Sequence, residues 1–231
     1  MFAGHIGAGL ALGRADRRIN VGVVILAALL LDLLLWLFIL LGWESASIPA
    51  DFAGSHQPHF TFPYSHSLLG SLVWSVLAAL AAYWWVRRLG ATRLGPAALV
   101  GTAVLSHWVL DALVHSPELP LAGPQSRMVG LGLWHSMPLA LIVEGLILTV
   151  GLWMYLPRAP ISQGKKRGVC ILGTVVLGFT IVGMTVAPSP PSVEAMAASS
   201  LITVLIVIAL AWWLGKVSDE PVYPFDGRSR P

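Results

Sequence analysis

Long apolar segments separated by short polar ones dominate the chain. A transmembrane helix needs about 20 apolar residues to cross ~30 Å of hydrocarbon. Six segments reach that length: 19–42, 67–86, 95–115, 133–156, 169–187 and 193–215. The pattern predicts an all-α polytopic membrane bundle of about six transmembrane helices. We expect one domain over 1–217, followed by a flexible polar C-terminal tail over 218–231.

Residues 1–13 are also apolar, but they are too few to cross a bilayer. They predict a short N-terminal helix that either dips into the membrane or lies in its interface. Apolar sequence begins before the first basic residue, so a cleaved signal peptide is not expected. Hydrophobic residues make up 56% of the chain and charged residues 11%, against about 25% charged in soluble domains. The single cysteine, Cys170, excludes an intramolecular disulfide.

The basic residues predict the orientation. Of the 14 Lys and Arg residues, only Arg127 falls in a loop on the second side of the membrane. The others are Arg14, Arg17, Arg18, Arg87, Arg88, Arg93, Arg158, Lys165, Lys166, Arg167, Lys216, Arg228 and Arg230. Because such loops stay in the cytoplasm, we expect a multi-pass protein of the inner (plasma) membrane with both termini cytoplasmic. Because the basic residues lie in short clusters between apolar runs, they suit a membrane surface and no nucleic-acid partner is expected. No phosphate-binding glycine motif occurs in a strand–helix context, so no nucleotide is expected either.

Ionisable residues inside the predicted spans are the strongest sign of function. A charged group near the bilayer centre costs several kcal/mol unless it is paired, wetted or ligated. His107 lies in the third span, and His66 and His115 lie near outer ends of spans. The carboxylates inside the spans are Asp32, Asp111 and Glu144.

The third span contains the sharpest pattern. His107, Asp111 and His115 are spaced by four residues each, so they are neighbours along one helix face. Such an imidazole and carboxylate can bind one divalent ion, or the carboxylate can orient the imidazole. His115 lies further round the helix and closer to the surface. Counted from the basic clusters, Asp32, His107 and Glu144 lie at similar depths, so these groups could converge.

Five positions together resemble a known family. They are His5 in the apolar N-terminal segment, Asp32, the Tyr-Ser-His-Ser-Leu element around His66, and the His107-x3-Asp111 pair. This pattern resembles the bacterial YdjM-like predicted membrane-bound metal-dependent hydrolases, over roughly the first half of the chain. The family has an Asp-x-Asp-His cluster where this chain has Asp32 alone. Of its His-Arg-Gly-x-Thr-His element this chain keeps only the final histidine, so a branch with one metal or none stays open.

The resemblance implies hydrolysis of an unidentified substrate with a divalent metal held by His and Asp. Imidazole and carboxylate ligands suit Zn, Mn or Fe, and a metal-bound water could attack an ester or phosphoester. We expect His107 and Asp111 as ligands and Glu144 as a candidate general base. Further ligand candidates are His66, His5, Asp32 and His115. A site in the outer half of the bundle would suit a lipid headgroup or an envelope intermediate.

Two other functions use the same residues. A proton-coupled permease or transporter would use intramembrane His, Asp and Glu as a relay, although no inverted repeat is evident and the last two spans have no central charged residue. A non-catalytic membrane scaffold would use them only to hold helices together. We expect the lipid bilayer as a partner, and a homodimer stays open.

Overall fold

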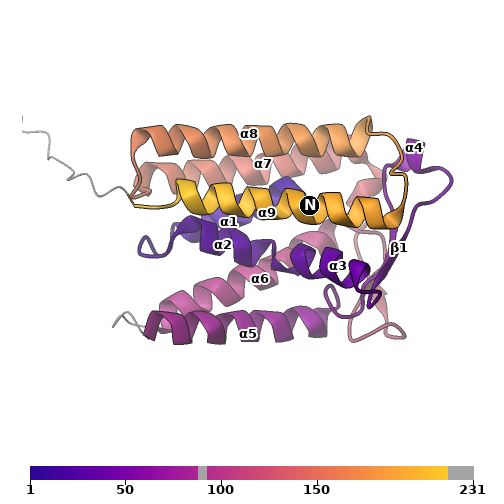
Figure 1. Ribbon diagram of the computed structural model, residues 1–231, viewed down its shortest axis with the longest axis horizontal. Coiled ribbons are helices and arrows are strands. Elements are labelled where there is room, and N and C mark those ends of the chain that lie inside the picture. Colours follow the sequence, from indigo (N-terminus) through magenta and orange to yellow (C-terminus); the bar gives the residue numbers. More distant parts are fainter. Residues whose placement is uncertain (88–92, 218–231) are drawn as a thin grey trace, which may run out of the picture.

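The computed structural model describes residues 1–87 and 93–217 and confirms an all-α helical bundle (Figure 1). Within these residues, five helices are long and apolar enough to cross a membrane, and a sixth span results if the bent pair α2 and α3 counts as one. The chain is therefore a multi-pass membrane protein. The helices are α1 (Phe2–Gly13), α2 (Val21–Ala28), α3 (Leu30–Leu40), α4 (Phe52–Ser55), α5 (Leu68–Arg87), α6 (Leu94–Val114), α7 (Met137–Tyr155), α8 (Gln163–Thr185) and α9 (Val193–Leu214), with the 3-10 turns η1 (Leu133–His135) and η2 (Leu156–Arg158).

Two short hairpins lie at one end of the bundle. Strand β1 (Ser45–Ser47) pairs antiparallel with β2 (His59–Thr61), and β3 (Leu119–Pro120) pairs antiparallel with β4 (Met128–Val129). These strands join the helix ends on the right of Figure 1, away from the turns that contain most basic residues. The predicted polar tail over 218–231 and the basic residue Arg88 lie outside the described residues.

The N-terminal helix α1 lies inside the bundle. It contacts α2, α6, α7 and α8, and eight of its 12 residues are buried. The sequence left open whether this helix enters the membrane or lies in its interface. In the structure α1 packs among the membrane-crossing helices. α1 crosses α7 at glycines: a Cβ on Gly7 would lie 2.6 Å from the carbonyl oxygen of Ile147. Only a residue without a side chain permits this close backbone approach.

The first predicted span is not one straight helix. The sequence predicted a continuous span over 19–42, but α2 and α3 meet at Leu29 with a bend of 51°. The break contains neither proline nor glycine. Instead the carbonyl oxygen of Ala28, at the end of α2, accepts a hydrogen bond from His107 Nδ1 on α6. A side chain that inserts into the helical hydrogen-bond ladder is a known cause of a sharp bend. The bend also places Asp32 in the first turn of α3.

The turns that contain most of the basic residues lie at the opposite end of the bundle. Lys165 Nζ at the start of α8 donates a hydrogen bond to the carbonyl oxygen of Lys216 after α9. In the turn between α1 and α2, Arg18 forms an ion pair with Asp16. The hydrogen bond from Arg18 lowers the pKa of the Asp16 carboxyl below its usual value. Asn20 then caps α2 by accepting from the backbone N–H of Gly22.

Candidate metal centre

Four structural elements bring five of the sequence-predicted site residues together. α1 contributes His5, the first turn of α3 contributes Asp32, and the turn before α5 contributes His66. α6 contributes the other histidine and carboxylate, His107 and Asp111. All but Asp32 are almost fully buried, and the Asp32 side chain is 20% exposed. The residues predicted from sequence thus form one cluster in the interior, with Asp32 as its most accessible member.

Asp111 lies at the centre of this cluster. Its Oδ2 atom lies 3.1 Å from His107 Nε2 and 3.4 Å from His66 Nε2. Its Oδ1 atom lies 3.1 Å from His5 Nε2, and it accepts a hydrogen bond of 3.2 Å from the amino nitrogen of Met1. One carboxylate therefore faces three imidazoles that come from separate parts of the chain.

Hydrogen bonds fix the tautomers of two of these imidazoles. His107 Nδ1 lies 2.7 Å from the Ala28 carbonyl oxygen, which can only accept, so this nitrogen carries the proton. His66 Nδ1 lies 2.8 Å from Ser65 Oγ. The Ser65 hydroxyl donates its one proton to Glu44 Oε2 at 2.6 Å, and it must therefore accept from His66. In both neutral imidazoles, Nε2 is left with the lone pair.

The two lone pairs face each other. His66 Nε2 and His107 Nε2 are 3.2 Å apart, and Asp111 Oδ2 lies beside both. Two nitrogen lone pairs and a carboxylate at this separation repel one another unless a proton or a cation lies among them. A histidine that binds a metal through one ring nitrogen usually donates a hydrogen bond from the other, as the Nδ1 atoms of His66 and His107 do here. The donor set of two imidazoles and a carboxylate fits Zn, Mn or Fe.

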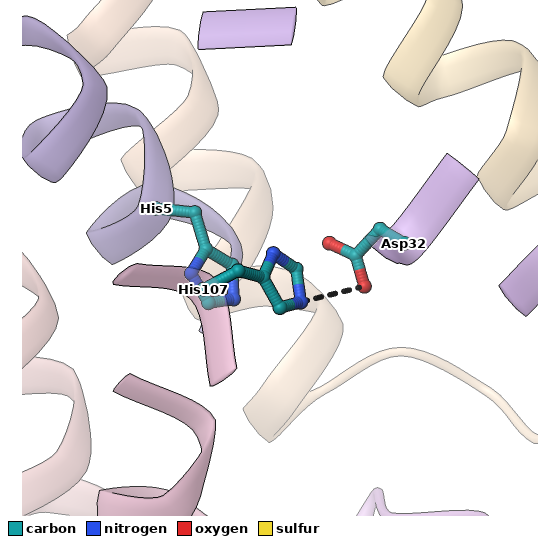
Figure 2. Close-up of side chains that lie close together, drawn as sticks. All are labelled: His5, Asp32 and His107. Carbon is teal, nitrogen blue, oxygen red and sulfur yellow. Dashed lines mark ion pairs between the residues drawn. The ribbon is translucent and has the colours of Figure 1, made fainter. Parts of the chain in front are cut away.

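Asp32 and His5 lie on either side of His107 (Figure 2). Asp32 Oδ1 is 3.7 Å from His107 Nε2 and 3.9 Å from His66 Nε2. The His5 ring stacks on the His107 ring, with centroids 3.7 Å apart and an interplanar angle of 9°. Although His5 Nε2 is close to Asp111, neither of its ring nitrogens makes a well-aligned hydrogen bond. A buried polar group without such a bond is costly, so His5 also fits a ligand role.

The cluster has room for a single ion. Within residues 1–87 and 93–217, two groupings bring ligand atoms within 4.8 Å of one another: His5, Asp32 and His107, and His66, His107 and Asp111. Both need His107, whose Nδ1 is already bonded to Ala28. Since only Nε2 of His107 is free to ligate, the groupings are alternative ligand sets and not two independent metal sites.

His115 lies at the edge of the cluster. Its Nε2 is 3.8 Å from Asp111 Oδ2, and its Nδ1 is 2.6 Å from Glu118 Oε1. The ring also packs against Trp134, with centroids 4.2 Å apart. Glu118 thus holds the imidazole so that Nε2 faces the centre. At this distance His115 is an outer candidate, either as a further ligand or as a proton carrier.

Glu144 lies beside the cluster and also holds the start of α1. Its Oε2 accepts a hydrogen bond of 3.2 Å from the backbone N–H of Gly4. The first N–H groups of a helix lack partners within the helix, so this carboxylate anchors α1 against α7. Glu144, Asp32 and Asp111 all line one cavity of about 540 Å³. An anchoring role is therefore evident from the contacts, and a role as general base stays a prediction.

Sequence reasoning missed the residues that orient the histidines. Glu118 follows His115 by three residues, but it lies in a loop beyond the end of α6, where a carboxylate ordinarily faces solvent. Ser65 precedes His66 directly. Glu44 gave no signal, because 21 residues separate it from Ser65 and only the β1–β2 hairpin brings them together.

Comparison of the chain with models of protein families, with curated proteins and with solved structures gives no match. The resemblance to the YdjM-like hydrolases therefore rests on the motifs in this sequence.

Proposed function

We propose that this chain is a membrane-embedded, metal-dependent hydrolase that acts on an ester or phosphoester. The observation that supports this proposal best is the pair of Nε2 lone pairs of His66 and His107, which face each other at 3.2 Å beside Asp111. Burying ionisable groups at membrane depth costs free energy, and such groups usually have a function. The family resemblance points in the same direction.

In this proposal His66, His107 and Asp111 hold one divalent ion, and Asp32 or His5 completes the ligand set. A bound ion of this kind supplies Lewis acidity and a water of lowered pKa. Ala28, Ser65 and Glu44 keep the two imidazoles in the ligating tautomer. Asp32 is the member most open to the cavity, so it lies where a substrate would enter.

Glu144 and His115 are the candidates for proton transfer. Both line the cavity that contains the ligands, and His115 is oriented by Glu118 at 2.6 Å. General acid–base catalysis needs such a group within hydrogen-bond reach of the reacting atoms. Either residue could take a proton from the attacking water or give one to the leaving oxygen.

The proposal includes the orientation predicted from the basic residues. The chain then lies in the inner membrane with both termini in the cytoplasm. The hairpin β1–β2 and Trp134 would lie on the outer side, and the cavity would accept its substrate from the outer half of the bilayer. A homodimer is compatible with this arrangement and is not required by it.

Hydrolysis in oriented vesicles tests function and orientation together. We expect release of product from ester or phosphoester lipids presented at the outer face, loss of release with a chelator, and recovery with Zn, Mn or Fe. His107→Ala should abolish release, because it removes a ligand, whereas His59→Ala, in the exposed part of β2, should not. No release above the chelated control would contradict the hydrolase and favour a proton relay or a scaffold. Release only from the inner face would contradict the orientation.

A further inference from the structure

The cavity that begins at the cluster continues between helices far from it in sequence. One end is lined by Asp32, His66 and Asp111, and the other by residues of α8 and α9. On these two helices the lining residues recur at helical spacing, so each helix presents one face to the cavity. The apolar ones and the glycine are Phe179, Gly183, Met184, Met196 and Val204, while Ser199, Ser200 and Thr203 add hydroxyl groups on α9 and Ala187 follows the end of α8. Sequence analysis assigned no functional residue to these last two spans.

This wall lies at membrane depth. α8 and α9 are both long and apolar enough to cross a bilayer. The lining residues extend from Phe179 to Met184 within α8 and from Met196 to Val204 within α9, which is about 8 Å and about 12 Å along the two helices. Phe179 lines the cavity and is also 56% exposed, so the wall reaches the face of the bundle that hydrocarbon would cover. The volume of about 540 Å³ falls in the range of ~300–1,000 Å³ typical of small-molecule sites.

Two residues that line this cavity, Thr180 and Trp134, each have a buried polar atom without a hydrogen-bond partner in the described part of the chain. Thr180 Oγ1 and Trp134 Nε1 are buried and make no hydrogen bond. Other threonines of α8, Thr174 and Thr185, donate to the carbonyl four residues earlier, as threonines in helices commonly do. Thr180 makes no such bond, so its hydroxyl lies unpaired in the wall of the cavity. Trp134 lies near His115 and offers a donor close to the cluster.

The charges that line the cavity restrict which headgroups it can bind. The acidic side chains among the described lining residues are Asp32, Asp111 and Glu144, and the Met1 amino group, which donates to Asp111, also lines the cavity. Because three carboxyl groups face this one amino group, a negatively charged headgroup would be repelled there unless a further cation is present. The far end accepts hydrocarbon without any cation.

From this arrangement we infer that the cavity binds one membrane lipid, with its hydrocarbon chain between α8 and α9 and its ester or phosphoester headgroup at the His/Asp cluster. The inference rests on the proposed function for the chemistry at the headgroup, but chain binding does not need it. The α8–α9 face then determines which substrates the site accepts, and the bilayer itself delivers them.

Glycines of α8 provide a matched pair of variants. A Cβ at Gly183 would meet no atom within 4 Å, and neither would one at Gly178. Gly183 lines the cavity, whereas Gly178 is exposed on the outside of the bundle. Gly183→Phe therefore directs a ring into the cavity from a Cβ that meets no other atom, and Gly178→Phe adds the same side chain elsewhere on the same helix.

The probe is lysophosphatidylglycerol, which has a single palmitoyl chain. Native mass spectrometry counts the probe molecules bound to protein that has been stripped of loosely bound lipid. Glycerol phosphate, which lacks the chain, is the soluble control. We expect the wild type and Gly178→Phe to retain one probe molecule. Gly183→Phe should bind it roughly tenfold less tightly, because the new ring occupies the space of the chain. Thr180→Val, which conserves volume, should weaken binding by a smaller factor and serves if Gly183→Phe fails to fold.

Equal retention by the wild type and by folded Gly183→Phe, or by Thr180→Val where the Phe variant does not fold, would overturn the inference. So would binding of glycerol phosphate as tight as that of the probe. Metal content measured on the same samples separates the two proposals. Gly183-dependent retention in protein that binds no metal supports the lipid site while the hydrolase fails. Metal binding without Gly183-dependent retention supports the metal centre, while the lipid site fails.

Discussion

Asp111→Asn is expected to abolish the stabilisation of the folded chain by divalent metal. An ion that binds only the folded state stabilises it by about 2.7 kcal/mol at a free concentration 100 times its Kd. Among the residues that the structure describes, Asp111 is the one carboxylate within 3.5 Å of His5, His66 and His107. An amide in its place removes the negative charge that a cation needs. Losing an outer-shell partner costs about 10–100-fold in affinity, and losing a ligand should cost more.

The measurement is thermal unfolding in detergent, with and without added Zn, Mn or Fe. Wild type should unfold at a higher temperature with metal, and Asp111→Asn should show no difference. Asp51→Asn is the matched control, because Asp51 is an exposed loop residue and should leave the metal effect intact. If metal stabilises Asp111→Asn as much as the wild type, the assigned ligands are wrong.

Gly7→Ala should destabilise the fold although the substitution favours helix formation. In a helix interior, alanine is better than glycine by about 0.5–1 kcal/mol. At Gly7, however, the added Cβ would lie 2.6 Å from the backbone of α7, and overpacking of this kind costs roughly 1–3 kcal/mol. The second effect is larger, so α1 should be displaced from α7.

Displacement of α1 should also damage the site, because α1 contributes His5 and its first turn is held by Glu144. We therefore expect Gly7→Ala to lower both the unfolding temperature and the metal content. Gly178→Ala adds the same methyl group where no atom lies within 4 Å, and it should be neutral or slightly stabilising. Equal unfolding temperatures for the two variants would show that the α1–α7 contact is not tight.

The site residues could be predicted from sequence because the free-energy cost of burying an ionisable group in a membrane makes such residues rare in apolar segments. Charged groups in apolar segments stand out, and the four-residue spacing of His107, Asp111 and His115 places them along one helix. Depth along the spans also placed Asp32 near them. These are local properties of the chain, and they need no knowledge of which helices are neighbours.

The remaining features depend on contacts between distant segments. The bend at Leu29 has no proline or glycine to announce it, since its cause is an imidazole from α6 that bonds to Ala28. The partnership of Glu44 with Ser65 requires a hairpin in a segment without strong strand signals. The cavity faces of α8 and α9 consist of ordinary apolar and small residues, and only packing distinguishes them from residues that face lipid.

Metal content tests the central claim most directly. Protein purified in mild detergent without chelator, then supplemented with each ion and desalted, would be analysed by elemental mass spectrometry. One ion of Zn, Mn or Fe per chain in the wild type and in His59→Ala, and none in folded His66→Ala and His107→Ala, is the result that we predict. No metal in the wild type after supplementation, or equal metal in all four proteins, would contradict a metal centre at His66, His107 and Asp111.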